Sequence, residues 1–210
     1  MAAGELEEAK SLAYDGMNLG DASQGGQSDW APLLLAIAQA EDDREAIIRW
    51  SAYGVLNQYG AFDELWPLLK AQYTAVQWPA EVDNLLAQLP SNYWNNHTHY
   101  YILAAEERTA DLIAVLQTNE ASPSTFEPFL PTLLPQYQAE VTQLYRRFVF
   151  EQLAERADRR KYRNCCKILV QMQKKGLYDE ACEIAAEMAQ QYRNRPSLLR
   201  ELHTFGFLTK

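Results

Sequence analysis

The sequence predicts an all-α fold in which antiparallel helix pairs stack side by side into an open superhelix, or solenoid. Three observations support this prediction. Apolar residues recur at spacings of three and four along most of the chain, short turns separate the helical stretches, and no stretch shows a convincing β-strand alternation. A short turn makes two amphipathic helices antiparallel, and stacked pairs then bury a continuous core.

The clearest helix pair covers residues 162–192. The apolar stripe of its first helix consists of Tyr162, Cys165, Leu169 and Met172. Gly176 ends this helix, because glycine accepts the left-handed conformation of a C-terminal cap. The second helix starts at once, and its apolar face consists of Ala181, Ile184, Ala185, Met188 and Tyr192. Neither helix can bury its stripe alone, so the two are expected to pack together.

The chain begins with a segment that differs from the rest. Residues 1–28 are predicted to form a short helix and a flexible connector, because the run from Gly20 to Ser28 is rich in glycine and polar residues. An α-helical repeat domain, residues 29–210, is expected to follow, with a sub-boundary near residues 120–135. Its first helix begins near residue 29, and its apolar face consists of Trp30, Leu33, Leu34, Ile37 and Ala38.

The middle of the chain continues the helical pattern as far as a proline-rich span. Helices are predicted near residues 45–60, 62–73, 79–89, 91–105 and 109–117. Residues 121–135 contain four prolines, which predicts a loop with at most short helical turns. A long helix from Gln136 to Ala157 is expected after this loop.

Two stretches repeat one short pattern, and the repeat carries a resemblance. Residues 60–65 and 176–181 both read glycine, apolar, aromatic, Asp, Glu, apolar. The second copy, with Gly176, Tyr178 and Ala181, resembles the tetratricopeptide-type repeat, in which a glycine and an aromatic residue mark the turn and a small residue marks the helix crossing. The resemblance implies a tetratricopeptide-like (TPR-like) superhelix that acts as a protein-binding scaffold. The first copy departs from the pattern, because Leu65 stands where the small residue belongs.

The C-terminal end carries a second resemblance. The basic helix that starts near Tyr162, the following helix rich in Glu and Ala, and the string from Gln191 to Leu202 are similar to the tail of bacterial SWIM zinc-finger proteins. The zinc motif of those proteins, C-x-C with C-x-H, is absent from this chain, so their zinc chemistry is not carried over. The resemblance implies a nucleic-acid-associated accessory domain as an alternative function.

Composition and charge limit the classes of partner and the location that are expected for this protein. The chain has 210 residues and a net charge of −9, with 7 Lys and Arg against 20 Asp and Glu in residues 1–150, and 12 against 8 in residues 151–210. An acidic body disfavours nonspecific binding to nucleic acid, except by the C-terminal part. The sequence contains no apolar run of membrane-spanning length, and its three cysteines form neither a disulfide framework nor a C-x-x-C pair. A cytoplasmic protein without a membrane partner is expected.

Two groups of residues are candidates for binding a partner. A basic stripe on one face of the helix near residue 160 consists of Arg156, Arg160, Arg163, Lys167 and Lys174. This stripe either binds an acidic partner, is simply solvated, or docks on the acidic body of the same chain. The aromatic candidates, Trp94, Tyr100 and Tyr101, either line a peptide-binding groove or pack in the core.

Catalytic and metal sites are not indicated. The sequence lacks phosphate-binding glycine motifs, the G-x-S-x-G motif and the H-E-x-x-H motif, and His97 and His99 point to different sides of a helix. We therefore predict a non-enzymatic protein–protein interaction or scaffold module that needs no cofactor or metal and binds a protein or peptide. The alternatives are the nucleic-acid-associated domain and, as a minor one, an enzyme whose site is assembled from distant positions.

Overall fold

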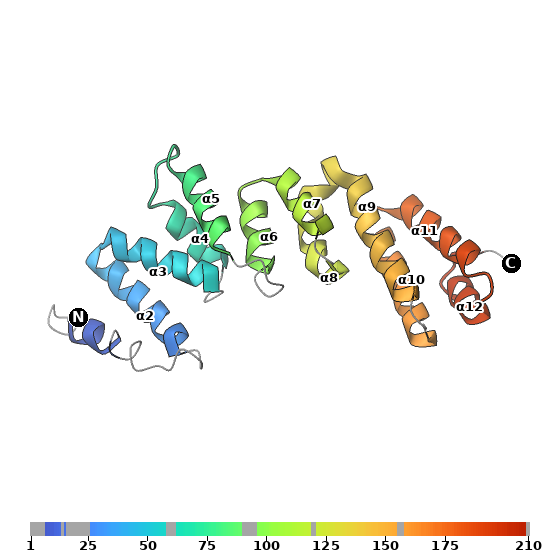
Figure 1. Cartoon of the computed structure of the whole chain (residues 1–210), viewed down its shortest axis with the longest axis horizontal. Helices are drawn as coiled ribbons and strands as arrows, with labels where there is room; N and C mark the ends of the chain where they lie inside the picture. Colours follow the sequence, from blue (N-terminus) through green and yellow to red (C-terminus); the bar gives the residue numbers. More distant parts are fainter. Residues whose placement is uncertain are drawn as a thin grey trace. The chain divides into compact units, whose positions relative to one another are not determined.

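The computed structural model of the chain describes residues 7–13, 15, 26–57, 62–89, 96–118, 121–154 and 158–208. This part of the chain is helical almost throughout and contains no strand, and neighbouring helices pack as antiparallel pairs (Figure 1). The all-α prediction is therefore confirmed for these residues. The chain divides into two compact units, residues 1–102 and 103–210. Within the described ranges, every helix is too short or too polar to cross a membrane.

The first unit is built on four helices, which are α2 (Gly26–Glu41), α3 (Arg44–Asn57), α4 (Phe62–Lys70) and α5 (Trp78–Gln88). Its core has two apolar clusters. The first cluster joins α2 and α3 to the helical segment 7–13, and it consists of Ala13, Ala31, Leu34, Ala38, Ile47 and Trp50. The second cluster joins α3, α4 and α5 and contains the stacked or crossed rings of Phe62, Trp66, Tyr73 and Trp78.

Two details of the first unit differ from the expectation. The helix α2 begins at Gly26 rather than near residue 29. Leu33, which was expected on the buried face, is 41% exposed, whereas Leu34 is buried. The reason is helical geometry, since neighbouring residues are turned by about 100° from each other and the buried stripe runs through Leu34 and Ala38.

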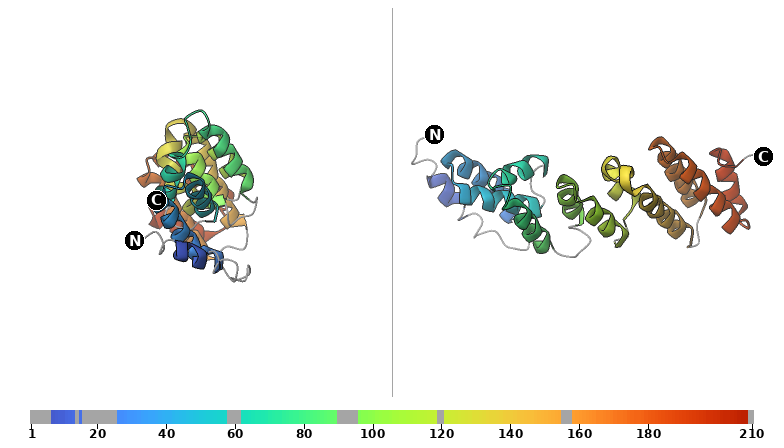
Figure 2. Two further views of the ribbon diagram at one scale, coloured as in Figure 1. Left: turned by 90° about the vertical axis from the view of Figure 1, so that its left-hand side faces the viewer. Right: turned by 90° about the horizontal axis from the view of Figure 1, so that it is seen from above.

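The remaining helices belong to the second unit, except that the boundary between the units falls inside α6. They are α6 (Asn96–Ala105), α7 (Thr109–Thr118), α8 (Pro123–Phe126), the 3-10 turn η2 (Glu127–Phe129), α9 (Leu130–Ala154), α10 (Arg159–Lys174), α11 (Tyr178–Gln191) and α12 (Pro196–Thr204). The long helix α9 packs against α7, α10 and α11, and α12 packs against α10 and α11. The right-hand view of Figure 2 shows α9, α10 and α11 side by side.

The proline-rich span contains more helix than the sequence predicts. The expected short turns are present as α8 and η2, but the long helix α9 already starts at Leu130 rather than at Gln136. Pro131 occupies the first turn of α9, where its missing N–H is not needed. Pro135 lies further inside, and the backbone leaves helical geometry two residues later, at Tyr137 (φ −128°, ψ 33°). The helix tolerates the second proline because it bends there.

Four helices end with the same hydrogen-bonded motif. After α2, α6, α10 and α12, one residue adopts a positive φ, and these residues are Asp42 (54°), Glu107 (55°), Gly176 (91°) and Gly206 (81°). In each motif two backbone N–H groups reach back to carbonyls of the last helical turn, with N–O distances between 2.8 and 3.3 Å. This is the Schellman arrangement, which satisfies carbonyls that a helix end leaves without partners.

Candidate interaction surface on the basic face of α10

The helix α10 forms where the sequence predicts the first member of the C-terminal pair. Asp158 caps its start, since the carboxylate oxygen Oδ1 accepts a hydrogen bond from the backbone N–H of Lys161 at 2.9 Å. At its end the N–H of Leu177 donates to the carbonyl of Met172 at 3.0 Å, and Gly176 supplies the positive φ. The helix α11 follows directly, so the predicted antiparallel pair is present.

One side of α10 is sealed in the core of the second unit. Its buried residues are Tyr162, Cys165, Cys166, Leu169 and Met172, which include the whole predicted stripe. Burial raises the pKa of the Cys165 thiol to about 11 and that of the Cys166 thiol to about 12, because a thiolate loses its hydration there. The Cys165 thiol also contacts the carbonyl of Val149 on α9, with a sulfur–oxygen distance of 3.9 Å. Both thiols therefore act as small apolar groups.

The other side of α10 is exposed and basic. Arg160, Arg163, Lys167 and Lys174 are all exposed, and their spacings of three, four and seven place them on one face. We call these four residues the basic stripe. At a rise of about 1.5 Å per residue, the stripe is about 21 Å long. Among the described residues, none of the four has a carboxylate within ion-pairing distance. The stripe is therefore not neutralised by the carboxylates that the structure describes.

Two other arginines of the second unit, Arg147 and Arg195, contribute to its internal structure instead. Arg147 donates to the carbonyl of Gln117 at 2.6 Å, at the end of α7. Arg195 donates to the carbonyl of Leu153 at 2.8 Å, near the end of α9. Positive groups are favourable at these two positions, because the C-terminal end of a helix carries partial negative charge. The basic stripe differs from both arginines, because its four cations lie on the exposed face of α10 rather than against the end of another helix.

The carboxylates of α11 are turned toward α9. Glu187 pairs with Arg146 at 3.2 Å, and Glu180 accepts a hydrogen bond from Gln138. Glu180 lies in an open groove of about 420 Å³ between α9 and α11, whose lining residues are Gln138, Ala139, Thr142, Gln143, Arg146, Asp179, Glu180 and Glu183. This groove was not predicted, because its two walls come from helices about 40 residues apart in the sequence.

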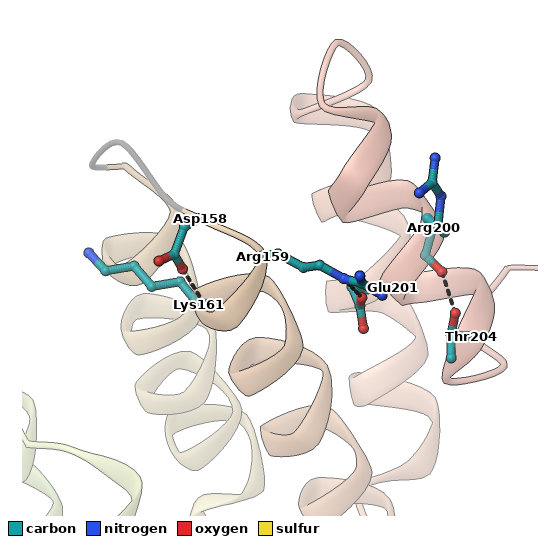
Figure 3. A network of polar contacts seen from close by, with 6 residues as sticks. All are labelled: Asp158, Arg159, Lys161, Arg200, Glu201 and Thr204. Atoms are coloured by element: carbon teal, nitrogen blue, oxygen red, sulfur yellow. Dashed lines mark hydrogen bonds and ion pairs between the residues drawn. The ribbon is translucent and has the colours of Figure 1, made fainter.

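An ion pair between the exposed Arg159 and the buried carboxylate of Glu201 joins α12 to the start of α10 (Figure 3). The carboxylate of Glu201 is only 4% exposed, and it accepts a hydrogen bond from Arg159 Nε at 2.8 Å. The neighbouring Arg200 is exposed, and its side chain points away from this pair. Arg159 therefore has a structural partner, whereas Arg160 beside it remains in the stripe. The sequence did not reveal this pair, because the two residues are far apart in the chain and nothing marks Glu201 as buried.

The remaining predicted binding residues do not form one surface. Arg156 and Trp94 lie outside the described residues. Tyr100 is 1% exposed, so of its two expected roles the structure shows packing in the core. Tyr101 is 42% exposed and lies with its ring centre 5.6 Å from that of Phe62. The other large aromatic side chains near it, Trp66 and Trp78, are buried, so the described aromatic residues do not line an exposed groove.

The described residues also contain no group of three or more His, Cys, Asp or Glu side chains arranged to hold a metal ion. Comparisons of the chain with family models, with curated proteins and with solved structures give no match.

Proposed function

We propose that the chain is a non-enzymatic protein–protein interaction module of TPR-like type, in which the basic stripe of α10 binds an acidic surface of a partner protein. The helix pairs are proposed to stack as a superhelix that presents this stripe. The observation that supports the proposal is that four exposed cations gather on one face of α10. Arg159 and Arg195 have internal partners, whereas Arg160, Arg163 and Lys167 are exposed without a carboxylate among the described residues.

Charge recognition is supported more strongly than recognition by aromatic rings. The described aromatic side chains near Tyr101 are mostly buried, so a peptide would find few rings to contact. A row of four exposed cations, in contrast, attracts an acidic segment over distances of about 10 Å at moderate salt. Arginine also forms two parallel hydrogen bonds with a carboxylate, which adds geometric selectivity.

A nucleic-acid partner is the second candidate, and the same stripe is the observation that favours it. A phosphate backbone would contact the row of cations in the same way as an acidic protein. Residues 1–102, however, hold 4 Lys and Arg against 14 Asp and Glu, so this unit repels a polyanion. A compact acidic protein surface meets less of this repulsion than a long nucleic acid, which places the protein partner first.

The test is affinity capture from the native cell by the full chain, followed by mass spectrometry, with and without nuclease. The variant Arg163→Glu with Lys167→Glu reverses the centre of the stripe. The matched control, Arg193→Glu with Arg200→Glu, makes the same charge change at exposed positions of the same unit. Proteins that the stripe variant loses and the control keeps, in the presence of nuclease, would support the proposal.

Two other results would count against the protein partner. Loss of the captured proteins after nuclease would favour the nucleic-acid alternative. Equal recovery by the wild type and the stripe variant would exclude the basic stripe as the binding surface.

A further inference from the structure

The basic stripe has a counterpart of opposite charge on the first unit of the same chain. Residues 1–102 hold 4 Lys and Arg against 14 Asp and Glu, whereas residues 103–210 hold 15 against 14. Five carboxylates of the first unit lie where α2 ends, where α3 begins and on the helical segment 7–13. We call this group the acidic corner, and it consists of Glu7, Glu41, Asp42, Asp43 and Glu45.

The contacts of Lys10 show that several of these carboxylates lie close together. Lys10 Nζ is 2.6 Å from Glu41 Oε2. This hydrogen bond, together with the negative charges of Glu41, Glu7 and Asp43 nearby, raises the pKa of Lys10. Asp43 also caps α3, since its Oδ1 accepts a hydrogen bond from the N–H of Ala46 at 3.1 Å.

The acidic corner keeps an excess of negative charge after its internal contacts are satisfied. Lys10 supplies one positive charge for Glu41 and its neighbours. Arg44 lies in the same turn and adds a second positive charge, and its guanidinium donates to the carbonyl of Gln72, with an Nε–O distance of 3.1 Å. Asp42 and Glu45 are exposed. The corner therefore presents carboxylates to solvent, as the stripe presents cations.

We propose that the basic stripe of α10 binds the acidic corner of a second copy of this chain. This inference rests on the proposed function and identifies the partner as a second molecule of the same protein. Each copy carries both surfaces, and the two surfaces lie on different units, so the contact is heterologous and joins molecules head to tail. Such a contact produces a ring if the rotation closes and an open chain if it does not.

Charge complementarity is the physical argument that a second copy of the chain binds the basic stripe. Opposite potentials on two patches speed their encounter and exclude partners of the wrong sign, even when the whole molecule carries a net charge of one sign. The net charge of −9 opposes association of two copies in general. Pairing the stripe with the corner is the arrangement that brings the opposite charges of two copies together.

The first experiment is sedimentation velocity of the full chain over a range of concentrations. At about 0.01 M ionic strength the screening length is about 30 Å, and at about 1 M it is about 3 Å. We expect the weight-average sedimentation coefficient to rise with concentration at low salt and to stay at the monomer value at high salt. Arg163→Glu with Lys167→Glu should weaken the association about tenfold or more, whereas the control Arg193→Glu with Arg200→Glu should not.

The second experiment reverses the corner and then combines the two reversed chains. Glu7→Lys with Glu45→Lys should also weaken association about tenfold or more, and its matched control is Asp63→Lys with Glu64→Lys, two exposed residues in the first turn of α4. Each reversed variant alone should be monomeric at concentrations at which the wild type associates. Mixing the stripe variant with the corner variant should restore association, because the acidic corner of one meets the intact basic stripe of the other.

Circular dichroism melting confirms that each variant is folded, and Arg163→Gln with Lys167→Gln provides a milder neutralisation if the reversal does not fold. A monomer at every concentration in low salt would overturn self-association. Equal effects of the stripe variant and its control, or a mixture that stays monomeric, would also overturn it. Stripe-dependent capture of another protein by a monomeric chain would overturn this inference and leave the proposed function intact.

Discussion

Among the carboxylates that the structure describes, Glu201 departs most from the rule that carboxylates lie at the surface. Its side chain is only 4% exposed, and Arg159 Nε lies 2.8 Å from its carboxylate oxygen. A buried carboxylate keeps its charge at low cost only while it is hydrogen-bonded. The pair therefore serves to hold α12 on α10, and the two residues should depend on each other.

We expect Arg159→Ala to lower the free energy of unfolding by about 1–3 kcal/mol, because the Glu201 carboxylate then remains buried with its hydrogen bond missing. Urea denaturation followed by circular dichroism measures the change. The added substitution Glu201→Gln should recover part of the loss, because it removes the unpaired charge. Arg200→Ala, at the exposed neighbour, is the control, and an equal loss in both single variants would contradict this role of Arg159.

The two buried thiols give the stability of the chain a dependence on alkaline pH. Their folded pKa values, about 11 for Cys165 and about 12 for Cys166, lie above the ordinary value of about 9, so the unfolded chain releases these protons first. Stability should be unaffected by the thiols below about pH 9 and should fall as the pH rises from there toward 12. The slope is up to about 1.4 kcal/mol per pH unit for each thiol.

Urea denaturation at a series of pH values tests this dependence. The variant Cys166→Ala should have a shallower alkaline slope than the wild type, whereas Cys182→Ala, at a position that is only half-buried, is the control. The slope will not vanish, because burial and the nearby carboxylate of Glu127 also raise the pKa of the Tyr145 hydroxyl. Identical slopes in the wild type and Cys166→Ala would contradict the assignment.

At the scale of elements, the four Schellman ends of α2, α6, α10 and α12 are not equivalent. Two are formed by glycine, but Asp42 and Glu107 adopt a positive φ with a side chain present. A left-handed backbone costs roughly 1–2 kcal/mol for a residue with a Cβ atom. Replacing glycine at a positive-φ position should therefore lower stability, whereas introducing glycine at Asp42 or Glu107 should raise it.

We expect Gly176→Ala to lower stability by about 1–2 kcal/mol, although no atom lies within 4 Å of the added Cβ atom, because the cost is conformational. Glu107→Gly should raise stability by about 0.5–1 kcal/mol, since the relief of strain exceeds the added flexibility of the unfolded chain. Thermal melting measures both changes. Gly176→Asn should lose less than Gly176→Ala, because asparagine tolerates this conformation. A neutral Gly176→Ala would exclude the explanation.

The elements that could be predicted from the sequence are those whose signals are local. The pair α10 and α11 follows from an apolar stripe at helical spacing and from Gly176 between the helices. The Schellman ends at Asp42 and Glu107 could not be predicted, because no glycine marks their left-handed residue. The sequence predicts too late a start for α9, because Pro131 and Pro135 indicate a loop. In the structure Pro131 lies in the first turn of α9, and the helix bends after Pro135.

In the candidate site, too, the features that depend on local sequence could be predicted, and those that depend on the packing of distant helices could not. The exposed positions of Arg160, Arg163 and Lys167 follow from their spacing relative to the buried stripe of α10. The pairing of Arg159 with Glu201 could not be predicted, because it depends on how α12 packs on α10. Tyr100 and Tyr101 are neighbours in the sequence, yet only the second reaches the surface, and this depends on the orientation of α6 in the core.

At the scale of the whole molecule, the division into residues 1–102 and 103–210 implies two separate cores. Leu69 is fully buried in the first unit, and Leu169 is fully buried in the second. Truncating either side chain to alanine removes apolar contacts and leaves a cavity, which costs about 2–5 kcal/mol. The cost should be confined to the unit that contains the substitution.

We therefore expect two transitions in differential scanning calorimetry of the full chain. Leu69→Ala should lower the midpoint of one transition and Leu169→Ala the midpoint of the other, because the two leucines belong to different units. The controls are Leu69→Met and Leu169→Met, which preserve the volume of the side chain and should change the midpoints less. A single transition that both alanine variants shift equally would show that the units unfold as one.

The half-buried Cys182 gives the chain a natural attachment point for a spectroscopic probe. Its sulfur lies 3.8 Å from the side-chain nitrogen of Gln173, at the seam between α11 and α10, while the other two thiols are sealed and unreactive. A fluorophore or spin label coupled under native conditions should therefore modify this position selectively. Its signal would report separation of the two helices in the wild-type chain, without any engineered cysteine.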